Sequence, residues 1–262
     1  MPDTKLYKMS GAGNDFVVLD GRGVDASEFR RWERIREVCS EFRTDGLMIL
    51  EESAEADFSM DFYNPDGSGG MMCGNGGRCI AAFADWLGIT PSAPDRYTFL
   101  APDGPHVAEI LSRPTGEASQ WTVRLQMIDV DGVQEVLGGY FLNTGTRHFV
   151  MFVEDVDAID VAEEGKALRW NEAFAPEGAN INFVQVCGDY LKIRTFEKGV
   201  EGETLACGTG ITAAALATWF AHCGGNNIHL QARRGDILTV DFVPAGPASF
   251  RKIHLTGPAE FV

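Results

Sequence analysis

Two stretches of the chain look like copies of each other, and each places a cysteine directly before a predicted helix. The first stretch runs from Met72 to Trp86 and the second from Ala206 to Phe220. Both contain Cys-Gly-x-Gly followed by small and apolar residues, and the two cysteines are Cys73 and Cys207. Roughly half of the chain therefore repeats the other half. Two matched cysteines indicate a site with two equivalent chemical groups, one from each half.

The repeat extends to the strands that precede each cysteine. Residues 58–64 and 191–197 alternate apolar and polar side chains, as a half-buried strand does, and a glycine-rich bend follows each of them. Residues 13–19 have a weaker counterpart in residues 145–151. Each half thus has the order strand, loop, strand, loop, cysteine, helix. This order predicts two similar α+β domains whose cysteines face one cleft.

Turn residues predict where several elements begin and end. One helix is predicted over Asn75–Leu87 and another over Gly208–Cys223, each followed by glycine. Residues 252–258 indicate a strand followed by a turn. The polar, turn-rich residues 112–119 are the predicted crossing between the domains.

Composition limits the class of protein and its partners. The 262 residues are 45% hydrophobic, which suits two domains with proper cores, and no apolar run is long enough to span a bilayer, so no membrane association is expected. The net charge of −16 disfavours nucleic acid as a partner. Six cysteines without an export signal or a Cys-x-x-Cys pair predict free thiols, a cytoplasmic location and no metal site.

The positions of Cys73 and Cys207 suit acid–base chemistry. A thiol at a helix N-terminus lies at the positive end of the helix dipole, where its pKa falls from about 8.5 into the range of roughly 3.5–7.5. The glycines that follow leave backbone N–H groups uncovered, and such groups bind a carboxylate. The remaining cysteines lie in apolar periodic stretches and are expected in the core: Cys39, Cys79, Cys187 and Cys223.

Two such thiols suit the inversion of a carbon that bears a proton. A thiolate removes the proton from one face and a thiol delivers a proton to the other, while N–H groups at the helix ends stabilise enolate-like charge on the bound carboxylate. This reaction needs no metal and no cofactor, and the chain has neither a P-loop nor a complete dinucleotide fingerprint. A thiol redox protein, which would be expected to have a close Cys-x-x-Cys, and a cysteine hydrolase, which uses one nucleophile, are the alternatives.

At these residues the chain resembles the diaminopimelate epimerase family. The family's Gly-x-Gly-Asn-Asp-Phe matches residues 11–16, and its Asn-x-Asp-Gly-Ser matches residues 64–68. Its two cysteine signatures, Met-Cys-Gly-Asn-Gly-x-Arg-Cys and Glu-Thr-x-Ala-Cys-Gly-Thr-Gly, match residues 72–79 and 203–210. The resemblance spans nearly the whole chain. It implies two pseudo-symmetric α+β domains, each a curved, mostly antiparallel sheet around a central helix, with the bounds 1–118 and 119–252 and a last strand, 253–262, that returns to the first domain.

The resemblance also implies an activity and residue roles. Members of the family work without pyridoxal phosphate and interconvert LL- and meso-diaminopimelate, on the path to lysine and cell-wall precursors. In the LL-to-meso direction Cys207 would accept the proton and Cys73 would donate one. The further implied roles are a backbone cradle for the reacting carboxylate at Gly74, Asn75, Gly208 and Thr209, substrate binding by Asn14, Asn64, Asn180 and Glu197, and adjustment of the thiol pKa values by His148 and Glu197.

Two departures from the family's pattern fall where the far end of the substrate is bound. Thr146 stands where the family has asparagine, and Lys198 stands where it has arginine. The arginine guanidinium makes two parallel hydrogen bonds to a carboxylate, whereas the lysine ammonium acts as a point charge, so lysine binds a carboxylate with a less defined geometry. Diaminopimelate is the expected substrate, with Thr146 and Lys198 among its contacts, and a related cofactor-independent racemase of another amino acid is the alternative. The resemblance further implies a homodimer.

Overall fold

The computed structural model describes residues 4–70, 72–116, 119–222 and 224–262. By its internal contacts the chain divides into two compact units, the first consisting of Met1–Leu125 with Gly257–Val262 and the second of Gln126–Thr256. Both units combine helices with mostly antiparallel strands, as the α+β prediction requires. The predicted domain boundary at residue 118 lies outside the described residues.

The first unit is built on a mixed sheet. Its strands are β1 (Leu6–Gly11), β2 (Asn14–Asp20), β3 (Gly46–Glu51), β4 (Phe58–Tyr63), β5 (Arg96–Ala101), β6 (Gly104–Ser112), β7 (Gln120–Gln126) and the last part of β17 (Ser249–Phe261). Two neighbouring pairs are parallel, β2 with β3 and β4 with β5, and the others are antiparallel. Because the end of β17 pairs with both β7 and β1, the strands form a closed ring.

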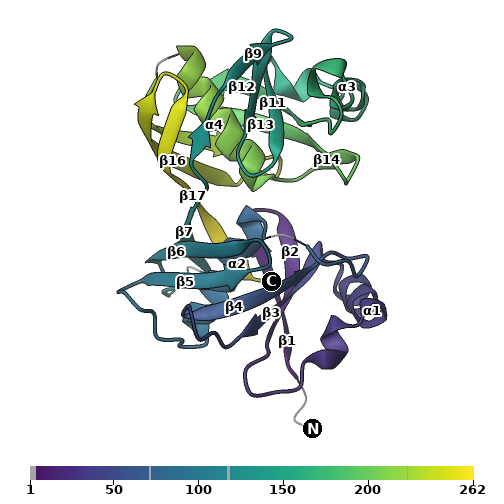
Figure 1. The fold of residues 1–262 in the computed structure, drawn as a ribbon, viewed down its shortest axis with the longest axis vertical. Coiled ribbons are helices and arrows are strands. Elements are labelled where there is room, and N and C mark those ends of the chain that lie inside the picture. Colours follow the sequence, from purple (N-terminus) through teal and green to yellow (C-terminus); the bar gives the residue numbers. More distant parts are fainter. Residues whose placement is uncertain (1–3, 71, 117–118, 223) are drawn as a thin grey trace. The chain divides into compact units, whose positions relative to one another are not determined.

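Helix α2 (Gly74–Trp86) is the central helix of the first unit (Figure 1). It contacts β1, β2, β3 and β6, and every residue from Gly74 to Ala84 is buried. A helix that is surrounded by strands has no solvent face, which explains why its sequence is glycine, alanine and apolar residues almost throughout. The helix ends at Trp86, and Gly88 adopts a φ of 72°, the left-handed conformation typical of a glycine stop.

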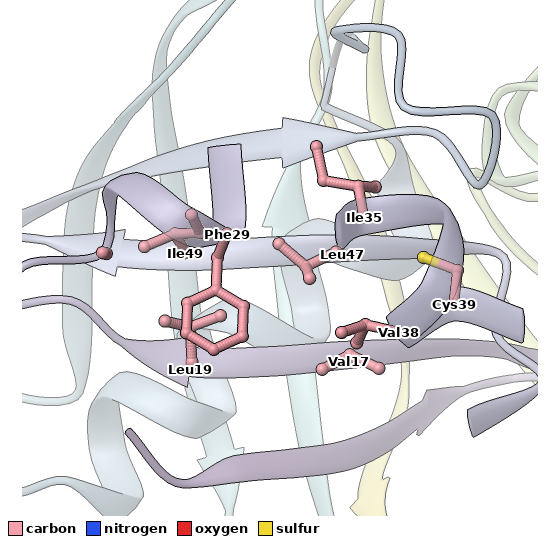
Figure 2. Close-up of a cluster of buried hydrophobic side chains, with 9 residues drawn as sticks. Val17, Leu19, Phe29, Ile35, Val38, Cys39, Leu47 and Ile49 are labelled. Carbon is pink, nitrogen blue, oxygen red and sulfur yellow. The ribbon is translucent and has the colours of Figure 1, made fainter. Parts of the chain in front are cut away.

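Helix α1 (Trp32–Phe42) covers a different face of the same strands. Its buried residues are spaced three and four positions apart, as expected of an amphipathic helix, and they pack on β2 and β3 together with the short helix η1 (Ser27–Arg30). Figure 2 shows this cluster, which contains Val17, Leu19, Ala26, Phe29, Ile35, Val38, Cys39, Leu47 and Ile49.

The second unit has the same kinds of element. Its strands are β8 (Val130–Asp131), β9 (Gln134–Val136), β10 (Gly139–Asn143), β11 (Arg147–Phe152), β12 (Asn180–Cys187), β13 (Tyr190–Glu197), β14 (Gly202–Thr204), β15 (Asn227–Gln231), β16 (Ile237–Gly246) and the first part of β17. Again two pairs are parallel, β11 with β12 and β13 with β15. The remaining neighbours are antiparallel.

Helix α4 (Gly208–His222) is the central helix of the second unit (Figure 1). It contacts β10, β11, β12, β13, β15 and β16, and its residues from Gly210 to Ala217 are buried. Helix α3 (Val161–Arg169) packs on β12 and β13 with the short helices η2 (Val156–Ala158) and η3 (Glu172–Phe174) nearby. The core beneath α3 contains Phe149, Val156, Val161, Phe174, Ala179, Ile181, Phe183 and Phe196.

The two helices that the sequence predicted and the strands predicted around residues 13–19, 58–64, 145–151 and 191–197 are present to within a residue or two. The turn expected within residues 252–258 is wrong. Strand β17 continues through Gly257 and Pro258, which pair with Val123 and Thr122 of β7. Proline has no backbone N–H to donate to a neighbouring strand. In the described part of the chain β17 pairs with β1 at Glu260 and Phe261, which follow Pro258, so at Pro258 the strand pairs with β7 alone.

Two of the four cysteines expected in the core are buried. Cys39 and Cys79 are 2% and 0% exposed. Cys187 is only partly buried, because it ends β12 next to the hairpin that leads to β13. Cys223 lies outside the described residues.

Candidate active site

Cys73 caps the N-terminus of α2. Its backbone is extended, and its sulfur accepts a hydrogen bond from the N–H of Gly76 at 3.2 Å. Its carbonyl accepts from the N–H of Gly77 at 2.8 Å, which starts the helix. Serine, threonine, aspartate and asparagine usually hold this position because the first N–H groups of a helix need acceptors. A sulfur in the same place lies at the positive end of the helix dipole.

Gly76 allows strands to approach the start of α2 closely. A Cβ at this position would lie 3.2 Å from the sulfur of Cys73 and 3.2 Å from the sulfur of Met48. The packing of Cys73 and Met48 against the start of α2 therefore favours glycine at this position, whose N–H group donates to the sulfur of Cys73.

A chain of hydrogen bonds fixes the amides of Asn75 and Asn14 beside Cys73. The Asn75 Nδ2 group donates to Asn14 Oδ1 at 2.5 Å, and Asn14 Nδ2 donates to an Asp45 carboxylate oxygen at 3.0 Å. Arg78 donates to Asn75 Oδ1 at 2.8 Å and to the carbonyl of Gly74 at 3.2 Å. Because guanidinium groups only donate and carboxylates only accept, the orientation of both amides is determined by their neighbours.

Asn64 lies at the end of β4 in a separate hydrogen-bonded turn. Its side chain donates to the hydroxyl of Ser68 at 3.0 Å, and its N–H donates to the carbonyl of Ser68 at 2.9 Å. The ring of Phe62 and the amide of Asn64 both lie close to Gly70.

Cys207 stands before α4 in the same way as Cys73 stands before α2. Its carbonyl accepts from the N–H of Ile211 at 2.8 Å, and the N–H of Gly210 donates to its sulfur. Its sulfur also lies 3.5 Å from the hydroxyl oxygen of Thr209. Cys207 is 9% exposed, whereas Cys73 is more open.

The pKa of Cys207 moves in the opposite direction from the one that its helix position suggests. Burial raises the pKa of this thiol well above its ordinary value, and the Glu197 carboxylate raises it further by its charge and by accepting the S–H hydrogen bond. Hydrogen bonds from Thr209 and from the N–H of Gly210 act in the lowering direction but do not outweigh burial. Cys207 therefore holds its proton until a base takes it.

His148 lies beneath Thr209 and is 0% exposed. Its Nε2 atom is 2.9 Å from the hydroxyl oxygens of both Thr209 and Thr146, and those two hydroxyl oxygens are 3.1 Å apart. Burial lowers the pKa of His148 to about 3, so the imidazole is neutral near neutral pH. The ring can donate or accept a hydrogen bond, but it carries no charge to the thiol.

Asn180 and Glu197 complete this cluster. Asn180 donates to Thr146 Oγ1 at 3.3 Å and accepts from the N–H of Lys198 at 2.7 Å. Glu197 accepts from the hydroxyl of Thr204 at 2.6 Å. Lys198 is an exposed residue that contacts the cluster through its backbone N–H group.

The structure thus brings the predicted residues together in two groups. The first unit holds Asn14, Cys73, Gly74 and Asn75, with Asn64 in a neighbouring turn. The second unit joins Thr146, His148, Asn180, Glu197, Cys207 and Thr209 by direct contacts. Gly208 is the first residue of α4 and lies between Cys207 and Thr209.

Sequence reasoning missed two side chains that organise these groups. Arg78 is 0% exposed and donates to Asn75 from one helical turn further along α2. Asn182 is 0% exposed and contacts His148. Both could have been found by spacing, since Arg78 lies three residues after Asn75 on a helix and Asn182 lies two residues after Asn180 on a strand.

The part of the chain that the structure describes contains no helix long and apolar enough to cross a membrane. Within the same residues, no group of three or more histidine, cysteine, aspartate and glutamate side chains is arranged to hold a metal ion.

Comparison with known families decides the relationship. The family described as diaminopimelate epimerase matches residues 6–117 and 140–262. The chain belongs to the diaminopimelate epimerase family. It is 40% identical to the diaminopimelate epimerase of Chlorobaculum tepidum, with 97% of each chain covered. It is also 40% identical to that of Flavobacterium psychrophilum, with 98% of each chain covered, and 39% identical to that of Aquifex aeolicus, with 97% and 94% covered.

Solved structures with this fold extend beyond the diaminopimelate epimerases. A phenazine biosynthesis protein of the PhzF family from Bacillus anthracis matches with a TM-score of 0.75 and 13% identity, over 100% of this chain and 98% of that one. A hydroxyproline epimerase from Agrobacterium vitis, with bound trans-4-hydroxy-L-proline, matches with a TM-score of 0.64 and 17% identity, over 98% and 90%. At these identities the likeness concerns the fold alone.

Proposed function

We propose that this protein is an isomerase that epimerises LL-diaminopimelate to meso-diaminopimelate without a cofactor, by proton transfer at the alpha carbon. Membership of the family supports the substrate and the reaction. The observation that carries the chemistry is that the thiol of Cys73 and the thiol of Cys207 each accept an N–H at the start of a buried helix. Two groups of equal chemistry are what a reversible inversion requires, because each must serve as acid in one direction and as base in the other.

In the proposed mechanism each thiol serves one face of the alpha carbon. In the LL-to-meso direction the sulfur of Cys207 takes the alpha proton and the S–H of Cys73 supplies a proton to the opposite face. The two sulfurs have then exchanged protonation states. The turnover in the reverse direction uses them in exchanged roles, so neither thiol is specialised as acid or base.

Glu197 supplies the route by which Cys207 becomes a thiolate. Burial keeps the pKa of Cys207 high, and the thiol donates to the Glu197 carboxylate. We propose that this carboxylate takes the S–H proton when the substrate arrives and releases it to solvent before the next turnover, while the Cys73 thiolate left by the reaction is reprotonated from solvent. The hydroxyl of Thr209 and the N–H of Gly210 then donate to the sulfur and stabilise the negative charge.

The N–H groups at the starts of the two helices are the proposed carboxylate cradle. They belong to Gly74 and Asn75 of α2 and to Gly208 and Thr209 of α4, which lie in the first turns where N–H groups have no partner within the helix. A carboxylate held there gains negative charge as the alpha proton leaves, and the helix dipole favours that charge. The amides of Asn14, Asn64 and Asn180 are proposed to bind the polar groups of the substrate.

We propose further that the two units are pseudo-symmetric copies. The support is that both run through the same series of pairings: antiparallel, parallel, antiparallel, parallel, antiparallel from β1 to β6 and from β10 to β16, with β14 as an addition. The peripheral helix, α1 or α3, follows the second strand of the series, and the central helix, α2 or α4, follows the fourth.

Thr146 and Lys198 are the residues proposed to bind the far end of the substrate. Thr146 directs its hydroxyl into the cluster with His148 and Thr209, and Lys198 is exposed. We propose that both contribute to the binding of the distal group, with Lys198 as a point charge. We also propose a homodimer that acts in the cytoplasm.

The test is incubation of the purified protein with LL-diaminopimelate, followed by chiral separation of the products. Formation of meso-diaminopimelate supports the proposal. Comparison of kcat/KM for LL-diaminopimelate with that for L-lysine tests the far end of the substrate. If the protein racemises L-lysine more efficiently, the racemase chemistry stands and the diaminopimelate assignment is wrong.

A further inference from the structure

The orientation of the buried Asn182 side chain is determined by its three contacts. Its Nδ2 group lies 3.0 Å from the carbonyl oxygen of Phe149, which can only accept. Its Oδ1 atom accepts from the hydroxyl of Thr195 at 3.0 Å. The opposite orientation would set two acceptors against each other at Phe149. The Nδ2 group therefore donates, and its second hydrogen faces His148 Nδ1 at 3.1 Å.

This contact determines which nitrogen of His148 carries the proton. Since Asn182 donates to Nδ1, that nitrogen must be the acceptor, and in a neutral imidazole the hydrogen is then on Nε2. The Nε2–H group donates to the hydroxyl oxygens of Thr209 and Thr146, each 2.9 Å away. Asn180 Nδ2 donates to Thr146 Oγ1 at 3.3 Å and lies 3.5 Å from His148 Nε2. At 3.5 Å a hydrogen bond is weak, so the shorter contact of Asn182 with Nδ1, at 3.1 Å, decides the tautomer.

The position of the hydrogen on His148 decides where the Thr209 hydroxyl points. When Nε2 carries the hydrogen, Thr209 Oγ1 accepts from it and its own hydrogen is available for the sulfur of Cys207, 3.5 Å away. When Nδ1 carries the hydrogen, Nε2 becomes an acceptor and draws the Thr209 hydrogen away from the sulfur. The two tautomers thus have opposite effects on the thiolate of Cys207.

We infer that Asn182 is a positioning residue that holds His148 as the Nε2–H tautomer and so directs the Thr209 hydroxyl hydrogen to the sulfur of Cys207. Its importance for catalysis rests on the proposed function of Cys207. Asn182 acts through His148 and Thr209 and does not itself reach the sulfur. Asn182 is also packed closely against α4, because a Cβ on Gly210 of that helix would lie 2.5 Å from Asn182 Oδ1.

The tautomer can be observed directly by long-range proton–nitrogen NMR on protein labelled with ¹⁵N-histidine. The His148 signals are identified by their loss in His148→Gln. We expect a protonated Nε2, an unprotonated Nδ1, and no change between about pH 5.5 and about pH 8.5, where an exposed histidine titrates. A His148 signal with the hydrogen on Nδ1, or one that titrates in this range, would overturn the inference.

The variant Asn182→Asp reverses the hydrogen-bonding character of this position, since an ionised carboxylate only accepts. We expect His148 Nδ1 to become protonated and the Cys207 pKa to rise by about one unit, the scale of one lost hydrogen bond. Alkylation of Cys207 by iodoacetamide below that pKa should slow about tenfold. The control is Asn226→Asp, because Asn226 Nδ2 also donates to a backbone carbonyl, that of Phe242 at 2.8 Å.

These readouts separate positioning from the effect of an added charge. If Asn182→Asp slows alkylation while the His148 tautomer stays unchanged, the added charge is responsible and the inference fails. A second variant, Thr195→Val, removes only the hydrogen bond to Asn182 Oδ1. Because the Phe149 carbonyl still accepts from Asn182 Nδ2, His148 should stay protonated on Nε2 in this variant, as in Thr195→Ser. A His148 protonated on Nδ1 in Thr195→Val would contradict the orientation assigned to Asn182.

Neither readout uses diaminopimelate, so the inference and the proposed function can fail separately. Wild-type protein with the expected tautomer but no epimerisation of LL-diaminopimelate would leave the hydrogen-bond chain intact and refute the activity. Wild-type protein that epimerises diaminopimelate with His148 protonated on Nδ1 would do the reverse.

Discussion

Replacement of Gly210 by alanine tests how tightly α4 is packed against the residues beneath Cys207. The added methyl carbon would lie 2.5 Å from Asn182 Oδ1, 3.3 Å from His148 Cε1 and 3.3 Å from the Cβ of Cys207. Real contacts of 2.5 Å do not occur, so either the helix or Asn182 must move. Asn182 is completely buried and held by hydrogen bonds to Thr195, His148 and Phe149, which leaves it no free direction.

Two effects of opposite sign set the magnitude. Alanine stabilises a helix interior by roughly 0.8–1 kcal/mol relative to glycine, and by less in the first turn, where Gly210 stands. Overpacking of a tight core costs roughly 1–3 kcal/mol, and each weakened hydrogen bond of Asn182 adds about 1 kcal/mol. The clash outweighs the helix preference, so we expect Gly210→Ala to lower the free energy of unfolding by about 2 kcal/mol. The displaced His148 and Thr209 should lower kcat at least about tenfold.

The assay is urea unfolding combined with epimerisation kinetics, with Gly202→Ala as the control. A Cβ on Gly202 would meet no heavy atom within 4 Å in the described part of the chain, so this variant should stay within about 0.5 kcal/mol of wild type. If Gly210→Ala is as stable and as active as wild type, the packing described around Asn182 is wrong.

Further substitutions test individual residues. Cys73→Ser and Cys207→Ser should each reduce epimerisation by at least about 10², the scale of a lost acid or base. Cys79→Ala should keep activity, because Cys79 is a buried residue of α2 and burial raises its pKa. Near-normal turnover by Cys73→Ser or Cys207→Ser would rule out the two-thiol mechanism. Glu197→Gln should lower the pKa of Cys207, so that alkylation at neutral pH becomes faster while epimerisation becomes slower; a parallel fall of both rates would argue against Glu197 as proton acceptor. Burial lowers the pKa of His148 to about 3, so below about pH 6.5 the unfolded chain binds a proton at His148 that the folded chain does not bind. Between about pH 6.5 and pH 4 the wild type should therefore lose more stability than His148→Gln. Equal losses of stability would show that His148 does not stay neutral.

The sequence was sufficient to predict what depends on near neighbours in the chain. The helices after Cys73 and Cys207 begin where the capping position and the glycines predict, and the strands before them follow from alternation of apolar residues.

What the sequence could not predict depends on burial and on contacts across the sheet. The helix end suggests a lowered pKa for Cys207, but the surrounding strands exclude water and Glu197 adds its negative charge, so the pKa is raised. The role of Asn182 could not be predicted either, because its amide is oriented by contacts that include Thr195 on the neighbouring strand. The continuation of β17 through Pro258 likewise depends on β7, which is distant in sequence.

The most direct test of the account is epimerisation of unlabelled LL-diaminopimelate in D₂O, sampled early in the reaction. Two thiols that serve opposite faces of the alpha carbon remove the original hydrogen on one side and deliver a solvent-derived one on the other. The account predicts that the first meso-diaminopimelate formed carries deuterium at the inverted carbon. Early product that retains its original hydrogen would show that a single base carries the proton across, and it would contradict the central claim.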